Sequence, residues 1–184
     1  MTYLKALTLS LLLAGLLVGC GDDQQEPETT PEDKQPVETT FAFPVNPDAP
    51  APDLDYLHVD TLVSHDGDGS WRIEATDSMT VGLLAIGNID IEDALLVYQA
   101  HVKTDSLDGQ TFLEMWCTFP GRGRFFSRDV STPLGGTTDW SREHTPFRLK
   151  AGENPDSVYL NIVVDGSGTV WIDDIRLLKG PLPQ

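Results

Sequence analysis

The feature that most limits the fold of this chain is an alternation of apolar and polar residues, repeated in several short segments. One face of residues 113–119 is apolar and consists of Leu113, Met115, Cys117 and Phe119. A period of two is typical of a β-strand with one buried face, because successive side chains point to opposite sides of the strand. Residues 94–102 and 158–164 repeat the pattern, and we expect burial of Ala94, Leu96, Tyr98, Ala100, Val102, Val158, Leu160, Ile162 and Val164.

Short runs rich in glycine and aspartate separate these segments. They are residues 66–69, 108–109, 121–123, 135–136 and 165–168. Short strands divided by such turns indicate an all-β fold. No stretch of the domain has helical periodicity, and no internal repeat is visible. The predicted fold is therefore all-β, a single jelly-roll-type β-sandwich.

The chain begins with a short polar start and an apolar run, residues 6–18, followed by Gly19 and Cys20. This run is shorter than the roughly 20 apolar residues of a membrane-spanning helix, and it has the size of the apolar region of a secretory signal. The sequence Leu-Val-Gly-Cys at residues 17–20 resembles the lipobox of bacterial lipoproteins. The resemblance implies that residues 1–19 are a signal peptide and that Cys20 carries lipid, which anchors the protein to a membrane. An apolar N-terminal helix packed in a core is the alternative.

Residues 20–55 are predicted to form a disordered, acidic tether between the lipid and the domain. Glu, Pro, Thr, Asp and Gln dominate it as far as Thr40, and such a composition buries too little apolar surface to fold. Residues 41–44 (Phe-Ala-Phe-Pro) are an exception, which we interpret as a first strand or as an arm packed on the domain. Residues 56–184 are then the β-sandwich domain. In enteric bacteria an aspartate directly after the lipidated cysteine favours retention in the inner membrane, and this chain has Gly21 there. We therefore expect the protein to be located in the cell envelope, at the outer membrane of a Gram-negative bacterium.

The charge and the cysteines exclude some functions. The formal net charge is −17, whereas nucleic-acid binding normally requires a basic face. We therefore expect no nucleic-acid partner. Cys20 and Cys117 are the only cysteines, so lipidation of Cys20 leaves Cys117 without a disulfide partner. We expect Cys117, which has apolar neighbours, to be buried rather than reactive.

Three further motifs indicate the type of domain to which residues 56–184 are similar. Residues 66–73 (DGDGSWRI) have the form DG…GS-x-(R/K)-(I/L), residues 137–147 contain T-x-x-W…F, and residues 166–177 (GSGTVWIDDIRL) contain a closing-strand pattern with paired aspartates. Together they resemble the galactose-binding-like β-sandwiches, which include many carbohydrate-binding modules. The resemblance implies the fold more strongly than the function, because one fold hosts many functions. We expect Trp140 and Phe147 to pack between two sheets, and Trp71 and Trp171 to be packed as well.

The same resemblance implies a structural calcium ion. Members often place an aspartate of the closing strand on calcium, and Asp174 is the nearest match. Calcium takes six to eight oxygen ligands, and Asp66, Asp68 and Asp60 lie in a part of the chain that is able to contribute some of them. The alternative is that Asp174 accepts hydrogen bonds from backbone amides at a bulge.

Carbohydrate recognition requires aromatic rings that stack on sugars and polar groups that bond hydroxyls. Trp116 is the best aromatic candidate, because the alternation points it away from the buried face and places Glu114 beside it. If the strands are neighbours, other side chains converge with these two on one surface. The candidates are Tyr159, Asn161, Gln99, His101 and, flanking them, Arg124 and Arg128. The alternative is that Trp116 is covered by a loop or by the arm at residues 41–44.

The sequence carries no motif for catalysis. The four histidines lack metal-ligand spacing, Gly166-Ser167-Gly168 is not a nucleophile elbow, and Gly121-x-Gly123 is not a dinucleotide site. We therefore predict a non-catalytic, lipid-anchored module outside the cytoplasm that binds a polysaccharide or oligosaccharide. The alternative is an envelope module that binds another protein or serves a structural role, and a small hydrolase is the third hypothesis.

Overall fold

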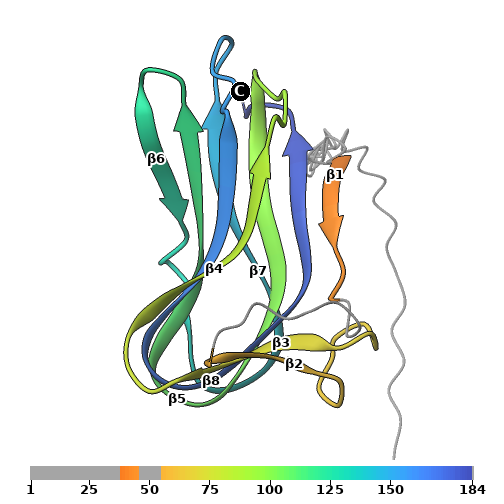
Figure 1. The fold of residues 1–184 in the computed structure, drawn as a ribbon, viewed down its shortest axis with the longest axis vertical. Helices are drawn as coiled ribbons and strands as arrows, with labels where there is room; N and C mark the ends of the chain where they lie inside the picture. The colour runs from red at the N-terminus through yellow and green to blue at the C-terminus, as the bar shows by residue number, and fades with distance from the viewer. Residues whose placement is uncertain (1–37, 46–54, 184) are drawn as a thin grey trace, which may run out of the picture. The chain divides into compact units, whose positions relative to one another are not determined.

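The computed structural model describes residues 38–45 and 55–183, which form eight β-strands (Figure 1). The strands are β1 (Glu38–Phe43), β2 (Leu57–Asp60), β3 (Ser70–Ala75), β4 (Met79–Gly87), β5 (Ala94–Phe119), β6 (Gly123–Arg128), β7 (Leu134–Leu149) and β8 (Ser157–Gly180). These residues contain no helix, and hence none that is long and apolar enough to cross a membrane. The predicted signal peptide, Cys20 and most of the tether lie outside the described residues.

β5 and β8 are the long strands on which the fold is built. They pair antiparallel over almost their whole length, and their register is interrupted between Asp105 and Asp108. There the two strands curve together, at the bottom of Figure 1. Gly166 of β8 lies in this bend with a φ of +143°, and a Cβ atom on it would lie 2.0 Å from the backbone oxygen of Asp108. The bend carries both strands from one layer of the domain to the other.

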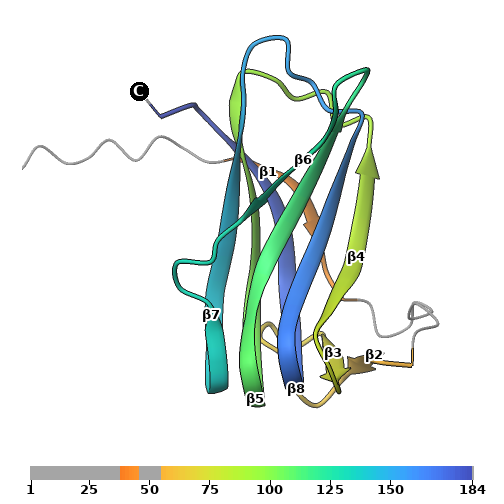
Figure 2. The same ribbon diagram turned by 90° about the vertical axis from the view of Figure 1, so that its left-hand side faces the viewer.

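Two layers result from this bend. The first contains the first half of β5 and the second half of β8, with β7 beside β5, β1 and β3 beside β8, and β2 beside β3. Figure 2 shows β7, β5 and β8 side by side. The second layer contains the other halves of β5 and β8, flanked by β6 and β4. The predicted all-β sandwich is confirmed.

The core includes the apolar residues that the alternation predicted, together with others such as Ile73, Leu149 and Ile175. None of the thirteen predicted positions in residues 94–102, 113–119 and 158–164 is more than 5% exposed. Trp71 packs against this core, and Trp171 is buried with its indole N–H donating to Asp60 at 3.0 Å. Burial of this apolar surface is the main stabilising contribution to the sandwich.

The prediction for Trp140 is wrong, whereas the one for Phe147 is confirmed. Ser141 pairs with the inward-facing Val102, so the neighbouring Trp140 points to the outer side of the first layer. Its ring meets that of His65 edge-on, with centroids 5.9 Å apart. Phe147 packs against the core, as expected. The error arises because a motif fixes the residue types but not their phase relative to the buried face.

β1 is part of the folded domain. The Phe-Ala-Phe segment singled out in the sequence lies in β1, which pairs antiparallel with β8 from Glu38 opposite Lys179 to Phe43 opposite Ile175. Phe41 and Phe43 both pack against the core. The domain therefore includes residues before position 56, where the sequence analysis set its boundary.

Cys117 is fully buried in the core and is a free thiol. Burial raises the pKa of this thiol to about 12, because the thiolate would lose its hydration. We therefore expect native protein that begins at residue 34, where Cys117 is the only cysteine, not to react with Ellman's reagent at pH 8. One thiol should react after unfolding in guanidinium chloride. Rapid reaction of the folded protein would contradict this burial.

Candidate functional site

The outer face of the second layer gathers the side chains that the sequence analysis singled out. Trp116 lies opposite Tyr159 of β8 and Phe126 of β6, and Glu114 lies opposite Asn161 of β8 and Arg128 of β6. Because paired residues project from the same side of a sheet, these six share one surface with two further neighbours. We call this surface the aromatic face; it consists of Phe112, Glu114, Trp116, Arg124, Phe126, Arg128, Tyr159 and Asn161.

Glu114 is the polar centre of the aromatic face. It is only 4% exposed, and its carboxylate accepts hydrogen bonds from Trp116 Nε1 at 2.6 Å and Asn161 Nδ2 at 3.1 Å. Arg128 donates to its other oxygen and forms an ion pair with it. A buried carboxylate is tolerated when its charge and its lone pairs have partners. Glu114 therefore fixes the orientation of the Trp116 ring and of the Asn161 amide.

The rings of the face lie close together, and arginines cover part of them. The Phe126 ring, 51% exposed, lies 5.0 Å from that of Trp116. The Arg124 guanidinium lies 5.1 Å from the Trp116 ring and 4.7 Å from the Tyr159 ring, which are cation–π distances. Arg124 is exposed, and no carboxylate among the described residues pairs with it in an ion pair. It therefore covers part of the two rings without an ion pair that holds it there.

A hollow continues the aromatic face toward the bend of β5 and β8. Its volume is about 340 Å³, within the size range of ligand pockets, and its lining includes Phe112, Arg128, Thr80, Val163 and Asp165. Phe112 and Arg128 belong to both the hollow and the face. Since a strand rises by about 3.3 Å per residue, Phe112 and Trp116 are about 13 Å apart along β5. The surface is long enough for more than one sugar ring.

The structure brings together five residues predicted to bind ligand, namely Trp116, Glu114, Tyr159, Asn161 and Arg128. It does not bring Gln99 and His101 to them, which corrects that expectation, because these two lie in the half of β5 that belongs to the first layer. Phe126 and Phe112 also belong to this face, although neither was among the predicted site residues. Phe126 could have been found from the turn at residues 121–123. This turn makes β6 the hairpin partner of β5, so that Phe126 lies opposite Trp116 and projects from the same side of the sheet.

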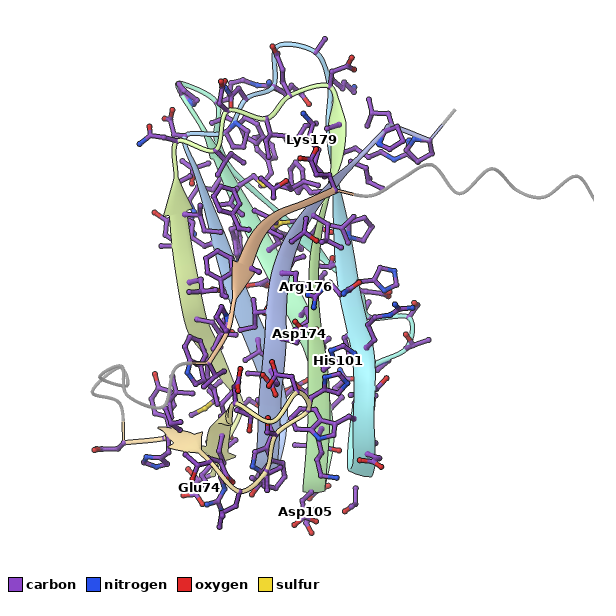
Figure 3. All side chains as sticks on the ribbon, turned by 90° about the vertical axis from the view of Figure 1, so that its right-hand side faces the viewer. Glu74, His101, Asp105, Asp174, Arg176 and Lys179 are labelled. Carbon is purple, nitrogen blue, oxygen red and sulfur yellow. The ribbon has the colours of Figure 1, made fainter. Side chains whose placement is uncertain are left out.

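A second cluster lies on the outer side of the first layer, where β8 has a bulge. Asp173 pairs with His101 and Arg176 pairs with Gln99, so β8 has one residue more than β5 between these two pairs. Asp174 has a φ of +50° there, a region few non-glycine residues adopt although aspartate is enriched in it. A bulge of this kind re-aims side chains. Figure 3 shows His101 of β5 with Asp174 and Arg176 of β8 in a row.

His101 is the centre of this cluster. Its ring stacks on that of His65, with centroids 3.6 Å apart and planes 10° apart. Its Nδ1 atom lies 3.3 Å from Asp174 Oδ2. Arg176 Nε donates to the other oxygen of Asp174 at 2.8 Å. Burial and the neighbouring His65 lower the pKa of His101, with Asp174 acting in the opposite sense.

Asp173, the other aspartate of the bulge, holds the loop of residues 61–69 on the sheet. It is fully buried and accepts hydrogen bonds from His65 N at 2.7 Å, Ser64 Oγ at 3.2 Å and Asp174 N at 2.7 Å. Hydrogen bonding to backbone amides at a bulge was the alternative prediction for Asp174. The bulge is present, but Asp173 is the residue that binds the amides, because its side chain points under the loop.

We expect Asp173→Ala to lower the free energy of unfolding by about 2–3 kcal/mol, since it leaves buried donors without an acceptor. Urea or thermal unfolding followed by circular dichroism measures the loss. Asp139→Ala is the control, because the Asp139 side chain is 91% exposed and surface changes stay within about 0.5 kcal/mol. Equal stability of the Asp173 variant and the wild type would show that the loop is held by other contacts.

The four aspartates named as possible calcium ligands do not form one group. Among the described residues, the only set of three His, Cys, Asp or Glu side chains with ligand atoms within 4.8 Å of one another is His65, His101 and Asp174. Asp66 instead accepts hydrogen bonds from Ser64 Oγ and from the Asp68 amide. The donors beside Asp174 are thus imidazole nitrogens, whereas calcium prefers oxygen. Calcium binding at these aspartates stays a prediction.

Comparison with known proteins relates the fold to a group of solved structures. No protein-family model matches the chain, and no curated protein matches it. The solved structure of a "Family 16 Carbohydrate Binding Module-2" is similar with a TM-score of 0.51 and 12% identity, covering 68% of this chain and 88% of that one. The CBM22-1 xylan-binding domain from Paenibacillus barcinonensis is similar with a TM-score of 0.55 and 12% identity, covering 81% and 99%.

A third structure contains the CBM22-1 and GH10 modules of a Clostridium thermocellum endo-1,4-beta-D-xylanase complexed with xylohexaose. It is similar with a TM-score of 0.50 and 11% identity, covering 66% of this chain and 24% of that chain. At identities of 11–12% the likeness is one of fold. This chain shares the β-sandwich fold of these carbohydrate-binding modules.

Proposed function

We propose that this protein is a non-catalytic carbohydrate-binding module that holds a polysaccharide or oligosaccharide along the aromatic face. The observation that carries the proposal is the convergence of Trp116, Tyr159 and Phe126 around one satisfied carboxylate, Glu114. Flat rings with oriented polar neighbours match the two sides of a sugar, whose C–H faces stack and whose hydroxyls form hydrogen bonds. The fold likeness to carbohydrate-binding modules supports the same proposal.

The polar groups of the face have distinct roles in this proposal. Asn161 has a carbonyl oxygen left to accept from a hydroxyl while its amide donates to Glu114. Arg124 swings off the rings of Trp116 and Tyr159 when a sugar stacks there, and its donors then reach hydroxyl or carboxylate oxygens at the rim. Glu114 accepts hydrogen bonds from Trp116, Asn161 and Arg128, so it orients its neighbours on the face.

The test is a binding screen with protein that begins at residue 34, since all described strands lie after that position. Insoluble xylan and cellulose, an acidic polysaccharide and peptidoglycan are incubated with the protein, and the bound fraction is measured. We expect retention on at least one polysaccharide and release by the matching oligosaccharide. A cooperative melt shows that the protein is folded. If the folded protein is retained on none of these polysaccharides, the carbohydrate proposal is overturned.

A second candidate function is binding of another envelope protein. The observation that favours it is the exposure of large apolar side chains on β6 and after it, with Phe125 at 46%, Phe126 at 51% and Val130 at 56%. Phe125 and Phe126 project from opposite sides of β6, toward Phe119 and Trp116, and exposed apolar surface often marks protein interfaces. A negative carbohydrate screen, followed by crosslinking in intact envelopes that depends on Phe125, would favour this function.

We further propose that the module is exported and anchored by lipid on Cys20, in the outer membrane of a Gram-negative bacterium. The lipobox-like residues 17–20 support this proposal. We expect Cys20→Ser to remain an uncleaved precursor that incorporates no radiolabelled palmitate, because the thiol that accepts the lipid is missing. Cys117→Ser is the matched control and should be lipidated as the wild type is. Normal processing of the Cys20 variant would contradict the anchor.

A further inference from the structure

We propose that His65, His101 and Asp174 bind one divalent transition-metal ion of the zinc class. The ion would fasten the loop of residues 61–69 to the β5–β8 sheet. This site lies on the first layer and is separate from the aromatic face, so the inference does not depend on carbohydrate binding.

The spacing of the ligand atoms fits such an ion. One nitrogen of each imidazole and one oxygen of Asp174 all lie within 4.8 Å of one another. His101 Nδ1 and Asp174 Oδ2 are 3.3 Å apart. Two ligand atoms on a tetrahedral ion, with bonds of about 2.0–2.1 Å, are also separated by about 3.3 Å. These two atoms therefore already have the separation that a shared ion requires.

The pair is close but is not a well-formed hydrogen bond. His101 Nδ1 is buried and has no hydrogen-bond partner among the described residues, although Asp174 Oδ2 is only 3.3 Å away. Two polar atoms that approach without pointing at each other are typical of ligands that converge on a third atom. A buried, unpartnered nitrogen is costly without such an atom.

Other residues hold Asp174 in position. Arg176 Nε donates to Asp174 Oδ1 at 2.8 Å, which leaves Oδ2 for the ion, as outer-shell partners of metal ligands commonly do. The bulge of β8 gives Asp174 its φ of +50° and turns its carboxylate toward His101. Strained backbone of this kind is often found where a side chain is positioned for function.

His65 completes the set after a change of ring orientation. The two imidazole planes are nearly parallel and 3.6 Å apart by centroid, whereas an ion lies close to the plane of each ring that it binds. His65 is exposed, so its ring is able to turn, while the bond from its backbone N–H to Asp173 keeps the residue above the sheet.

The donor set selects the class of ion. Two imidazoles and one carboxylate suit zinc, cobalt, nickel and copper, whereas calcium and magnesium require mostly oxygen ligands. The site joins residues more than 100 positions apart, His65 and Asp174. An ion bound there stabilises the folded chain, because the unfolded chain does not hold these ligands together.

The test is metal titration of the full chain, purified in detergent and stripped with chelator. Cobalt(II) is added first, because its visible absorption reports tetrahedral nitrogen and oxygen coordination, and zinc is then added to displace it. We expect one equivalent to bind and zinc to raise the melting temperature. His65→Ala and Asp174→Asn should weaken binding by more than about tenfold, since even outer-shell losses cost about 10- to 100-fold. Asparagine tolerates the positive φ of Asp174, so this variant should fold.

His58→Ala is the matched control, because His58 is an exposed histidine of β2 outside the cluster. It should bind cobalt as tightly as the wild type. Three results would overturn the proposal: no saturable cobalt binding by folded protein, binding that His65→Ala leaves unchanged, or a rise in melting temperature with calcium alone. The last result would instead support the oxygen-ligand site expected from the sequence motif.

Discussion

Replacing Gly166 by alanine is expected to lower the free energy of unfolding by about 3 kcal/mol or more. Gly166 has a φ of +143°, and a Cβ atom there would lie 2.0 Å from the backbone oxygen of Asp108 on the paired strand. An L-residue in this region costs about 1–3 kcal/mol by itself, and the clash forces β5 and β8 apart at the bend that joins the two layers. For a domain of this size, such a loss lowers the melting temperature by about 10 °C or more.

Gly67→Ala separates the clash from the backbone strain. Gly67 has a φ of +102°, but no atom lies within 4 Å of the position of its Cβ. We expect this variant to lose only about 1–2 kcal/mol. Differential scanning calorimetry of both variants makes the comparison. If Gly166→Ala were no less stable than Gly67→Ala, the close approach of β5 and β8 at the bend would be wrong.

Trp116→Ala is expected to weaken carbohydrate binding by about 30-fold or more, as truncation of a central tryptophan typically costs about 2 kcal/mol or more. The variant removes the ring on which Phe126 and Arg124 pack. It also removes a donor to Glu114, so the polar side of the face loses its orientation. Isothermal titration calorimetry with the best oligosaccharide from the screen measures the change in Kd.

Trp140→Ala is the matched control for this experiment. Trp140 is also a partly exposed tryptophan, but it lies on the outer side of the other layer, against His65. We expect its Kd to equal that of the wild type within about twofold. Equal losses of affinity in the two variants would indicate nonspecific adhesion to aromatic residues. A loss of affinity in Trp140→Ala alone would place the ligand on the first layer and contradict the proposed site.

The fold was largely predictable because its strands are amphipathic. Residues such as Met115, Leu160 and Tyr98 alternate with polar neighbours, and the period of two assigns both the strand and its buried face. The alternation could not predict that β5 is one continuous strand. Residues 94–102 and 113–119 read as two strands, whereas they are two halves of one strand that bends between layers. The bend depends on backbone contacts between β5 and β8, which are distant in sequence.

The same continuity explains which parts of the aromatic face were predicted. Glu114 and Trp116 share a phase within one segment, so their common face follows from local sequence. Asn161 and Tyr159 have the matching phase on β8, and the register of the pair brings them together. Gln99 and His101 have an equivalent phase, but they lie beyond the bend. Phase alone therefore does not distinguish the outer sides of the two layers.

The paired aspartates show a different limit. The sequence indicates that Asp173 and Asp174 interrupt an apolar strand and need partners. It does not indicate which of them turns inward, because a bulge breaks the alternation on which such a prediction depends. Asp173 accepts bonds from the loop, and Asp174 faces His101. His65 joins them only through folding of the 61–69 loop, and no sequence spacing reveals that contact.

The most direct test of the central claim is an NMR titration of isotope-labelled protein, beginning at residue 34, with xylohexaose and with the oligosaccharide favoured in the screen. We predict that the largest shift changes are those of the Trp116 indole N–H, the Asn161 side-chain amide and the β6 amides near Phe126, while signals of His101 and Trp140 stay unchanged. Shift changes confined to the first layer, or none with any sugar that the screen retains, would contradict the assignment of carbohydrate binding to the aromatic face.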